Sequence, residues 1–368
     1  MKLTSDQVLA WRMRRQFLNR PPDAGTVAIV KRLCGVQAQV TSSAEQAVAV
    51  RRSTPNRGEV GERLSDRSIV KTWAMRGTLH LLASEDAAAY LALISAARTW
   101  EKGSWQRTFA TAKQLAAITD AARESLNGTV LSREELTTEI VRKTGDDLIA
   151  EQLRSGWGAV LKPLAWQGLL VYGPSEGNRV TFTSPETWLP TWPGLPEPDE
   201  AAQTVIPAYL GAFGPASMTT FDQWLIRGQS KKAQIKSWFT DLEQTGKLVQ
   251  VEVDGKQAYA RTEDVDDLAT TDPTTEIRLL PAFDQYVLGP GTKNPQIIAP
   301  ERRDHVSKAA GWISPVVIAG GRVVGTWTTD GESLDVILFT EAGPVSKQAI
   351  EKEAARLGDT LRVGVRTG

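Results

Sequence analysis

The sequence is poor in the residues from which metal and redox sites are built. It contains one cysteine, Cys34, and two histidines, His80 and His305, in 368 residues. A lone cysteine cannot form an internal disulfide, which favours a reducing compartment such as the cytoplasm. With so few thiols and imidazoles, no zinc-ligand cluster is recognisable, and we expect neither a metal nor another cofactor.

Long apolar runs and a net charge are also absent. The sequence contains no run of eighteen apolar residues, so it predicts no membrane span. The first residues, "MKLTSDQVLAW", lack the apolar stretch of a signal peptide. The 43 Lys and Arg balance the 43 Asp and Glu, which argues weakly against a nucleic-acid binder. Residues 1–60, however, carry ten basic side chains against four acidic ones. This asymmetry fits a basic face for a polyanion, or simply solvated surface.

The first part of the chain carries helix signals followed by a hairpin signal. A capping box in "TSDQ" precedes one helix, which the prolines after "FLNR" end. A second helix fits "TVAIVKRLC", with Gly35 as its C-cap. The run "IVKTWAMRGTLHLL" predicts two strands joined near Arg76 and Gly77. Helices followed by a hairpin are the order of a winged helix.

The same order recurs twice. "LSREELTTEIVRK" begins with a second capping box, a helix across residues 151–167 follows, and "QGLLVYGPSEGNRVTF" reads as strand, turn and strand. In the third copy two helices lead into "GKLVQVEVDGKQAYAR", with a turn at Asp254-Gly255. From about Ile277 short β-branched runs predict strands, among them "IRLLPAF", "QYVLG", "PVVIAG", "RVVGTWTT" and "LDVILF".

We therefore predict an α+β chain of three tandem winged-helix units followed by a C-terminal β-barrel with a final helix and strand. The predicted boundaries are residues 1–110, 111–198, 199–270 and 271–368.

The stretch "LCGVQAQVTSS" is a candidate site, although its two glutamines have no pKa near neutrality. Residues two apart point away from each other in a helix but to the same side in an extended segment. Because Gly35 ends the helix, Gln37 and Gln39 are expected to face one side. Taken alone the motif is a weak signal, and two glutamines that satisfy backbone groups at a helix end would look the same.

Five motifs together are specific: "GVQAQ", "KTWAMRGTLHLLASED", "AYLGAFGPASMTTFDQWL", "LLPAFDQYVLG" and "GGRVVGTW". With them the chain resembles the AlkZ/YcaQ family of bacterial DNA glycosylases, from residue 35 to residue 327. The resemblance implies winged helices on a β-barrel, removal of alkylated purines from DNA, and a catalytic motif that falls on Gln37 and Gln39. The chain matches the branch whose motif ends in Gln, which is linked to self-resistance against the crosslinking agent azinomycin. The acid of the other branch is absent.

Two amides suffice only for a weakened glycosidic bond. An N7-alkylguanine is cationic and leaves as a neutral base, so no general acid is needed. Glutamine oxygens can place a water and stabilise an oxocarbenium-like sugar through position and dipole. The expected substrates are therefore cationic alkylpurines in duplex DNA, including crosslinks through guanine N7. No lysine adjoins the motif, so we expect a monofunctional glycosylase.

Other polar residues are candidates for DNA contact. Arg76 and His80 share the predicted hairpin, Arg179 lies on a wing, and a basic run precedes the last helix of the third copy. The turn "GPGTKNPQ", between two predicted barrel strands, could enter the minor groove. Each has an ordinary alternative as solvated surface or, for His80, as a structural residue. The candidate DNA-binding residues are Arg76, His80, Arg179, Lys231, Lys232, Lys293 and Asn294.

Two functions without catalysis stay open at this point. Winged helices also serve transcription regulators, which ordinarily bind two-fold operators as dimers. The zero net charge would suit a scaffold for protein contacts. Three units and a barrel suffice to grip a duplex, so a monomer is the simpler expectation.

Overall fold

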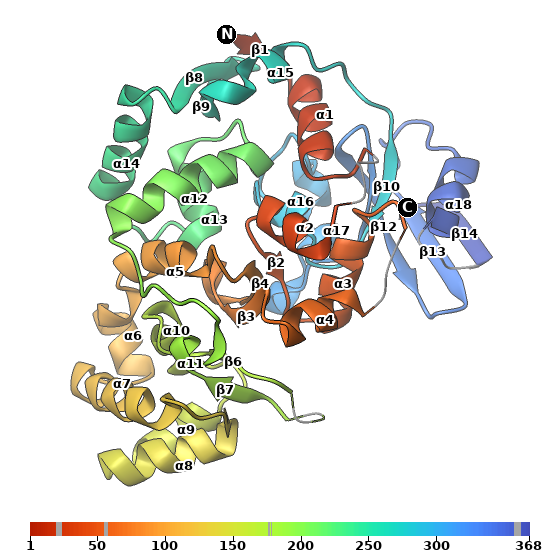
Figure 1. The fold of residues 1–368 in the computed structure, drawn as a ribbon. Coiled ribbons are helices and arrows are strands. Elements are labelled where there is room, and N and C mark those ends of the chain that lie inside the picture. The colour runs from red at the N-terminus through yellow and green to blue at the C-terminus, as the bar shows by residue number, and fades with distance from the viewer. Residues whose placement is uncertain (20–23, 55–57, 176, 178, 357–361) are drawn as a thin grey trace. The chain divides into compact units, whose positions relative to one another are not determined.

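A computed structural model of the chain describes residues 1–19, 24–54, 58–175, 177, 179–356 and 362–368 (Figure 1). These residues form two compact units. Unit 1 comprises Met1–Val60, Ile206–Trp224 and Phe239–Gly368, and unit 2 comprises Gly61–Val205 and Leu225–Trp238. The four-part division predicted from the sequence stays a prediction.

Unit 1 holds the N-terminal helices and most strands. Its helices are α1 (Ser5–Arg15), α2 (Thr26–Arg32), α3 (Thr41–Ala49), α15 (Val265–Ala269), α16 (Gln285–Leu288), α17 (Arg303–Val306) and α18 (Lys347–Arg356). Its strands are β1 (Lys2–Leu3), β2 (Val36–Gln37), β8 (Leu248–Val253), β9 (Lys256–Arg261), β10 (Ile277–Leu280), β11 (Val316–Ala319), β12 (Arg322–Thr329), β13 (Ser333–Leu338) and β14 (Arg362–Thr367). Three short 3-10 helices are η4 (Thr262–Asp264), η5 (Pro300–Arg302) and η6 (Ala309–Gly311).

Unit 2 is mainly helical. Its helices are α5 (Ala87–Ala96), α6 (Gly103–Thr108), α7 (Ala112–Leu126), α8 (Arg133–Thr144), α9 (Ala150–Arg154), α10 (Leu161–Trp166) and α11 (Pro185–Trp188), with η1 (Met75–Gly77), η2 (Thr99–Glu101) and η3 (Asp147–Ile149). Its strands are β3 (Ile69–Trp73), β4 (Leu79–Ala83), β5 (Leu131–Ser132), β6 (Val171–Tyr172) and β7 (Thr181–Thr183). The division between the units falls within α4 (Glu59–Ser65), α12 (Pro198–Phe213), α13 (Met218–Ile226) and α14 (Lys232–Gln244).

The largest sheet lies in unit 1 and has the order β10-β11-β12-β13-β14. Neighbouring strands are antiparallel except β13 and β14, which run parallel. Among the described residues β10 and β14 are free edges, so the sheet is open and the expected closed barrel is not confirmed. Helix α18 packs on this sheet through Ile350 and Ala354, which share a core with Leu279 and Val336.

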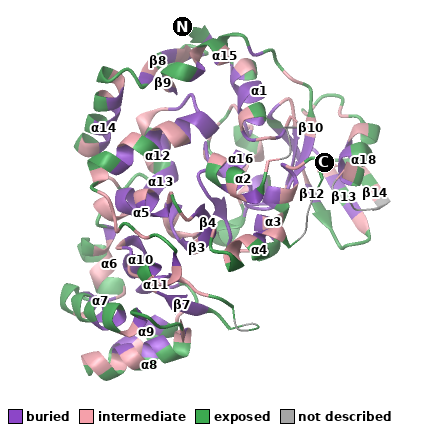
Figure 2. Ribbon diagram, in the orientation of Figure 1, coloured by how far each residue is buried: buried purple, intermediate pink, exposed green. Residues whose placement is uncertain are grey.

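The first helix of the chain packs into the core of the β-rich segment. The predicted capping box is present, with reciprocal hydrogen bonds between Thr4 and Gln7. Leu9 and Met13 of α1 are fully buried in one cluster with Tyr286 and residues of β11. Figure 2 colours the elements of unit 1 by burial. Unit 1 therefore joins segments from the two ends of the sequence.

The core of unit 2 forms around the β3–β4 hairpin, which the sequence predicted. Its strands pair antiparallel from Ile69 with Ala83 to Trp73 with Leu79. The Trp73 ring stacks on Phe182 with centroids 5.9 Å apart and meets Tyr172 edge-on at 5.2 Å. The second capping box, Ser132 with Glu135, is also present.

Three expectations about local structure are wrong. Residues 151–167 form two short helices, α9 and α10, because Gly156 and Gly158 interrupt the run and Gly158 adopts φ +61°. The run "QYVLG" is not a strand: Asp284 accepts a hydrogen bond from Tyr286 N at 2.8 Å and caps the helical turn α16. The segment "GPGTKNPQ" consequently joins α16 to η5 and is not a hairpin between strands.

The end of α2 also differs in detail. Its C-cap is Leu33, not Gly35, because Cys34 already adopts a left-handed φ of 53°. Gly35, at φ 97°, still donates its N–H to Val30 O at 2.9 Å and closes the helix end.

No helix in the described part of the chain is long and apolar enough to cross a membrane.

A buried ion pair joins the segment after α3 to the β-rich part of unit 1. Both Nη atoms of Arg51 lie 2.7 Å from the two carboxylate oxygens of Asp284. Arg51 also donates to Gln16 O at 3.0 Å and Ala47 O at 2.7 Å, and neither charged side chain is exposed. Because Arg51 donates four hydrogen bonds inside the protein, two of them to the Asp284 carboxylate, they offset the desolvation of the pair.

We expect Arg51→Met to lower the free energy of unfolding by about 3–5 kcal/mol, since it leaves the Asp284 carboxylate buried without its partner. The double variant Arg51→Met/Asp284→Leu should lie closer to the parent, because no lone charge remains. Urea unfolding measures both. Arg123→Met, at a residue with 60% of its side chain exposed, is the control. Equal stability of Arg51→Met and this control would contradict the prediction.

Candidate functional site

A pair of glutamine amides lies in the link between α2 and α3. Gln37 ends β2, and its Nε2 donates to Gln39 Oε1 at 3.4 Å. Gln37 is 5% exposed, whereas Gln39 is exposed. The two amides therefore lie on one side of the chain, as extended backbone predicts. Their catalytic role stays a prediction.

The backbone around the pair is shaped by the end of α2. The positive φ angles of Cys34 and Gly35 turn the chain out of the helix and into β2. The flanking side chains of Val36 and Ala38 are 1% and 2% exposed, so they hold the link in the core. This leaves Gln39 as the member of the pair that solvent can reach.

The far end of α3 is anchored to unit 1 by charged side chains. Arg51 follows the helix and forms the buried pair with Asp284. One residue earlier, Val50 O accepts a hydrogen bond from Arg356 of α18 at 3.1 Å. Since α3 begins two residues after Gln39, these contacts fix the helix that continues from the amide pair.

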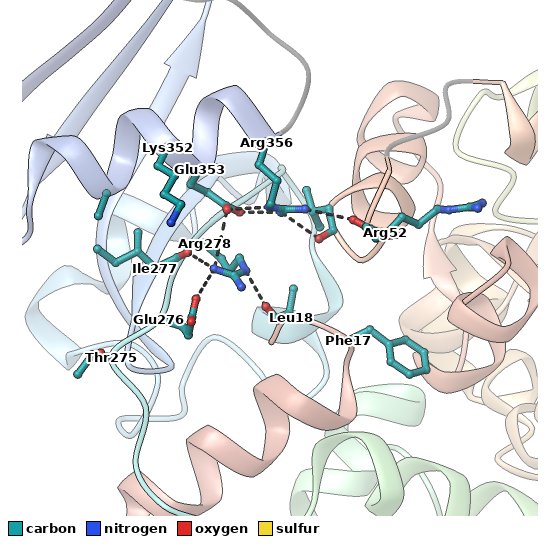
Figure 3. A pocket seen from close by; sticks show the side chains of 13 residues that line it. Phe17, Leu18, Arg52, Thr275, Glu276, Ile277, Arg278, Lys352, Glu353 and Arg356 are labelled. Carbon is teal, nitrogen blue, oxygen red and sulfur yellow. Dashed lines mark hydrogen bonds and ion pairs between the residues drawn. The ribbon is translucent and has the colours of Figure 1, made fainter. Parts of the chain in front are cut away.

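Arg356 belongs to a network around a cavity of about 590 Å³ in unit 1 (Figure 3). Glu353 accepts two hydrogen bonds from Arg356, at 2.8 and 2.7 Å. Arg278 reaches from β10 to Glu276 Oε2 at 2.7 Å and to Leu18 O at 2.6 Å. Each carboxylate in this cavity is thus engaged by an arginine, which fits a network that holds α18 in place.

Arg76 occupies the turn η1 between β3 and β4. It is half-buried, adopts φ 58° and lines a second cavity, of about 470 Å³, in unit 2. Three further basic residues line that cavity, Lys102, Lys162 and Arg227. The sequence did not single them out, because they belong to separate segments with no motif in common.

His80 is fully buried in β4, which favours the structural alternative over contact with DNA. Its Nδ1 lies 3.0 Å from Thr78 O, so Nδ1 carries the proton and donates it. Burial, with a smaller contribution from the charge of Arg76, lowers the pKa of His80 to about 3. The imidazole is therefore neutral at physiological pH and cannot contribute a charge to a phosphate contact.

The other predicted DNA contacts lie at the surface of their units. Arg179 is exposed ahead of β7, and Lys231 and Lys232 are exposed at the start of α14. Lys293 is exposed in the segment between α16 and η5, where Asn294 Oδ1 accepts from Gln296 N at 2.9 Å. Contact of these residues with DNA stays a prediction.

No group of three or more His, Cys, Asp or Glu side chains among the described residues is arranged to hold a metal ion.

We expect His80 to make stability depend on pH in acid. The unfolded chain binds a proton at His80 below about pH 6.5, whereas the folded chain does so only near pH 3. The free energy of unfolding therefore falls as the pH is lowered from 6.5 to 3, and His80 does not change it above this range. The loss at pH 5 is about 2 kcal/mol relative to pH 7. Urea unfolding of His80→Asn, whose amide can still donate to Thr78 O, should show a smaller loss. His305→Asn, at the exposed histidine, is the control and should keep the parental loss.

Comparison with known proteins identifies the family. The family described as "DNA glycosylase AlkZ-like" matches residues 30–360. A protein of Streptomyces sahachiroi named "Interstrand DNA cross-link repair glycosylase" is 48% identical over 359 residues, which cover 97% of this chain and 96% of that protein. The solved structure "Streptomyces sahachiroi DNA glycosylase AlkZ" matches with a TM-score of 0.94 and 48% identity, covering 100% of both chains. The chain therefore belongs to the AlkZ-like DNA glycosylase family.

Proposed function

We propose that this DNA glycosylase hydrolyses the N-glycosidic bond of cationic N7-alkylguanines and unhooks interstrand crosslinks formed through guanine N7. Gln37 and Gln39 are the proposed catalytic residues. The observation that carries this assignment is the amide pair itself, in which a buried glutamine donates a hydrogen bond to an exposed one.

The amide pair offers the hydrogen-bond acceptor that the proposed reaction needs. Gln39 Oε1 accepts one hydrogen bond from Gln37, and a carbonyl oxygen has a second lone pair that can accept from water. Gln37 is held in the core, so it fixes the direction of the Gln39 amide. An amide oxygen placed in advance stabilises developing positive charge without reorganising at the moment of reaction.

The proposed step needs no ionisable group. Water forms a bond to deoxyribose C1′ while the bond from C1′ to the base nitrogen breaks. The bonding electrons leave with the alkylguanine, which thereby becomes neutral, and the water proton passes to solvent. An unmodified guanine would leave as an anion and would need a general acid, which neither glutamine can supply. This limits the substrate to bases that already carry a charge.

Extension to crosslinks is supported by the printed name of the Streptomyces sahachiroi relative, an interstrand cross-link repair glycosylase 48% identical to this chain. A guanine tied to the opposite strand cannot swing freely out of the helix, so the site must reach the lesion in the groove. The exposed position of Gln39 suits such an open site.

We also propose that helix–helix–hairpin segments act as winged helices on duplex DNA and that the β-rich segment completes a barrel-like support. The order α13, α14, β8 and β9 supports this reading for the third segment. Arg179, Lys231, Lys232 and Lys293 are proposed backbone contacts, since their exposure leaves them available to phosphates, and the half-buried Asn294 is proposed beside Lys293.

We expect Gln37→Ala and Gln39→Ala each to slow single-turnover release of N7-methylguanine by roughly 100-fold or more, because each removes a preorganised dipole from the reacting centre. Strand breaks after heating with alkali report the abasic sites. Gln46→Ala, an exposed glutamine of α3, is the matched control and should keep the parental rate. Parental rates for both site variants would refute the assignment.

We expect the rate of base release to be level between about pH 6 and pH 8, since neither proposed catalytic side chain titrates there and His80, with its pKa of about 3, stays neutral. The measurement is the single-turnover rate at saturating protein on N7-methylguanine DNA. A bell-shaped profile with a midpoint in this range would show an ionisable catalytic group and contradict the proposed chemistry.

On a duplex with a guanine N7 crosslink, the parent should release separable strands on a denaturing gel, and Gln39→Ala should not. Activity on the singly alkylated duplex together with failure on the crosslinked one would remove the unhooking proposal alone.

A further inference from the structure

The cavity of unit 2 that Arg76 lines has an unusual charge. Of its fourteen lining residues none is acidic, and four are basic: Arg76, Lys102, Lys162 and Arg227. Like charges brought together repel, so such a cluster is destabilising unless an anion or solvent offsets it. The cavity of about 590 Å³ in unit 1 differs, because its arginines face carboxylates.

The cations come from four separate parts of unit 2. Arg76 belongs to η1, Lys102 follows η2, Lys162 belongs to α10 and Arg227 follows α13. Lys102 Nζ donates to Gln229 Oε1 at 3.0 Å, which links two of these segments across the cavity wall. No single helix or loop produces the site, so it exists only in the folded unit.

Two of the cations sit on strained backbone. Arg76 and Arg227 both adopt φ 58°, and each precedes a glycine with positive φ. A left-handed conformation costs a non-glycine residue on the order of 1–3 kcal/mol and is found most often at functional sites. Here two such Arg-Gly turns meet at one cavity.

The cavity also offers a hydrogen-bond donor. Trp166 lines it, is 6% exposed, and its indole Nε1 is buried without a hydrogen-bond partner in the described part of the chain. An indole N–H can only donate, so its natural partner is an acceptor such as a phosphate oxygen. Burial is the main cause that lowers the pKa of Lys162, and repulsion by the charge of Arg227 is the second. An anion bound between the two side chains would offset this repulsion.

We propose that this cavity binds a phosphate of the DNA backbone, with Lys162 and Arg227 supplying charge and Trp166 supplying a neutral hydrogen bond. The inference rests on the proposed function in so far as DNA is the ligand. Arginine and lysine are the usual phosphate partners, and a neutral N–H adds a contact that salt does not screen. The site would bind the backbone of the duplex and carry no catalytic group.

The test is fluorescence anisotropy with a labelled, undamaged duplex at several salt concentrations, so no chemistry is involved. Lys162→Gln/Arg227→Gln should weaken binding at least roughly tenfold near 0.1 M salt and reduce the slope of log K against log salt by about 2, one counterion per lost contact. Lys113→Gln removes an exposed lysine of α7 and is the matched control. It should change the affinity and the salt slope only by the small effect of losing one solvated charge.

Trp166→Phe separates the hydrogen bond from the charges. It should lower affinity several-fold while leaving the salt slope unchanged, because no cation is lost. The midpoint of thermal unfolding is measured for every variant, and a midpoint equal to that of the parent shows that the fold is intact. Parental affinity and slope for the double variant overturn the proposal.

Competition with inorganic phosphate and with polyglutamate distinguishes the source of the phosphate and the kind of partner. Inorganic phosphate at constant ionic strength should displace the duplex from the parent only weakly. Strong displacement by inorganic phosphate assigns the cavity to a free anion, and displacement by polyglutamate as strong as by DNA assigns it to an acidic protein; either result overturns the backbone assignment. A parent that binds the duplex but releases no alkylated base contradicts the proposed function and leaves the cavity proposal standing.

Discussion

The ion pair of Arg51 and Asp284 is the constraint on which the arrangement of unit 1 depends. It ties the segment after α3 to the turn that begins α16, and Arg51 donates four hydrogen bonds to oxygen atoms inside the protein. Buried pairs of this kind add little net stability, yet they tolerate only one geometry. Because α3 begins two residues after Gln39, that geometry also constrains where the amide pair lies.

The chemistry proposed for Gln37 and Gln39 follows from what these amides lack. An amide pair offers dipoles and position but neither donates nor removes a proton, so reactivity has to reside in the substrate. In the proposed reaction a cationic alkylpurine supplies it, since the base leaves as a neutral molecule. Four basic side chains gather elsewhere, in the acid-free cavity of unit 2 for which we propose a phosphate ligand. In these proposals, the neutral groups that act on the sugar and the charged groups that bind the DNA backbone belong to separate parts of the chain.

Much of the local structure could be predicted because its causes are local. Both capping boxes, the β3–β4 hairpin and the turn at Asp254 and Gly255 are encoded by residues within a few positions of one another. The errors have another origin. "QYVLG" has the composition of a strand, but the Asp284 side chain caps a helical turn there while it pairs with Arg51, which lies 233 positions away. The open edges of the C-terminal sheet likewise depend on pairing between distant strands.

The sequence by itself predicted that α2 ends before the glutamines, although it misplaced the C-cap, and that an extended link puts both glutamines on one side, because glycine and the period of a strand act over a few residues. Its motifs also indicated the family. Only the tertiary structure decided that Gln37 is buried and Gln39 exposed, that His80 is neutral in the core, and that four cations with no acidic neighbour line one cavity. Burial and electrostatic environment are sums over side chains from distant segments, and no short pattern contains them.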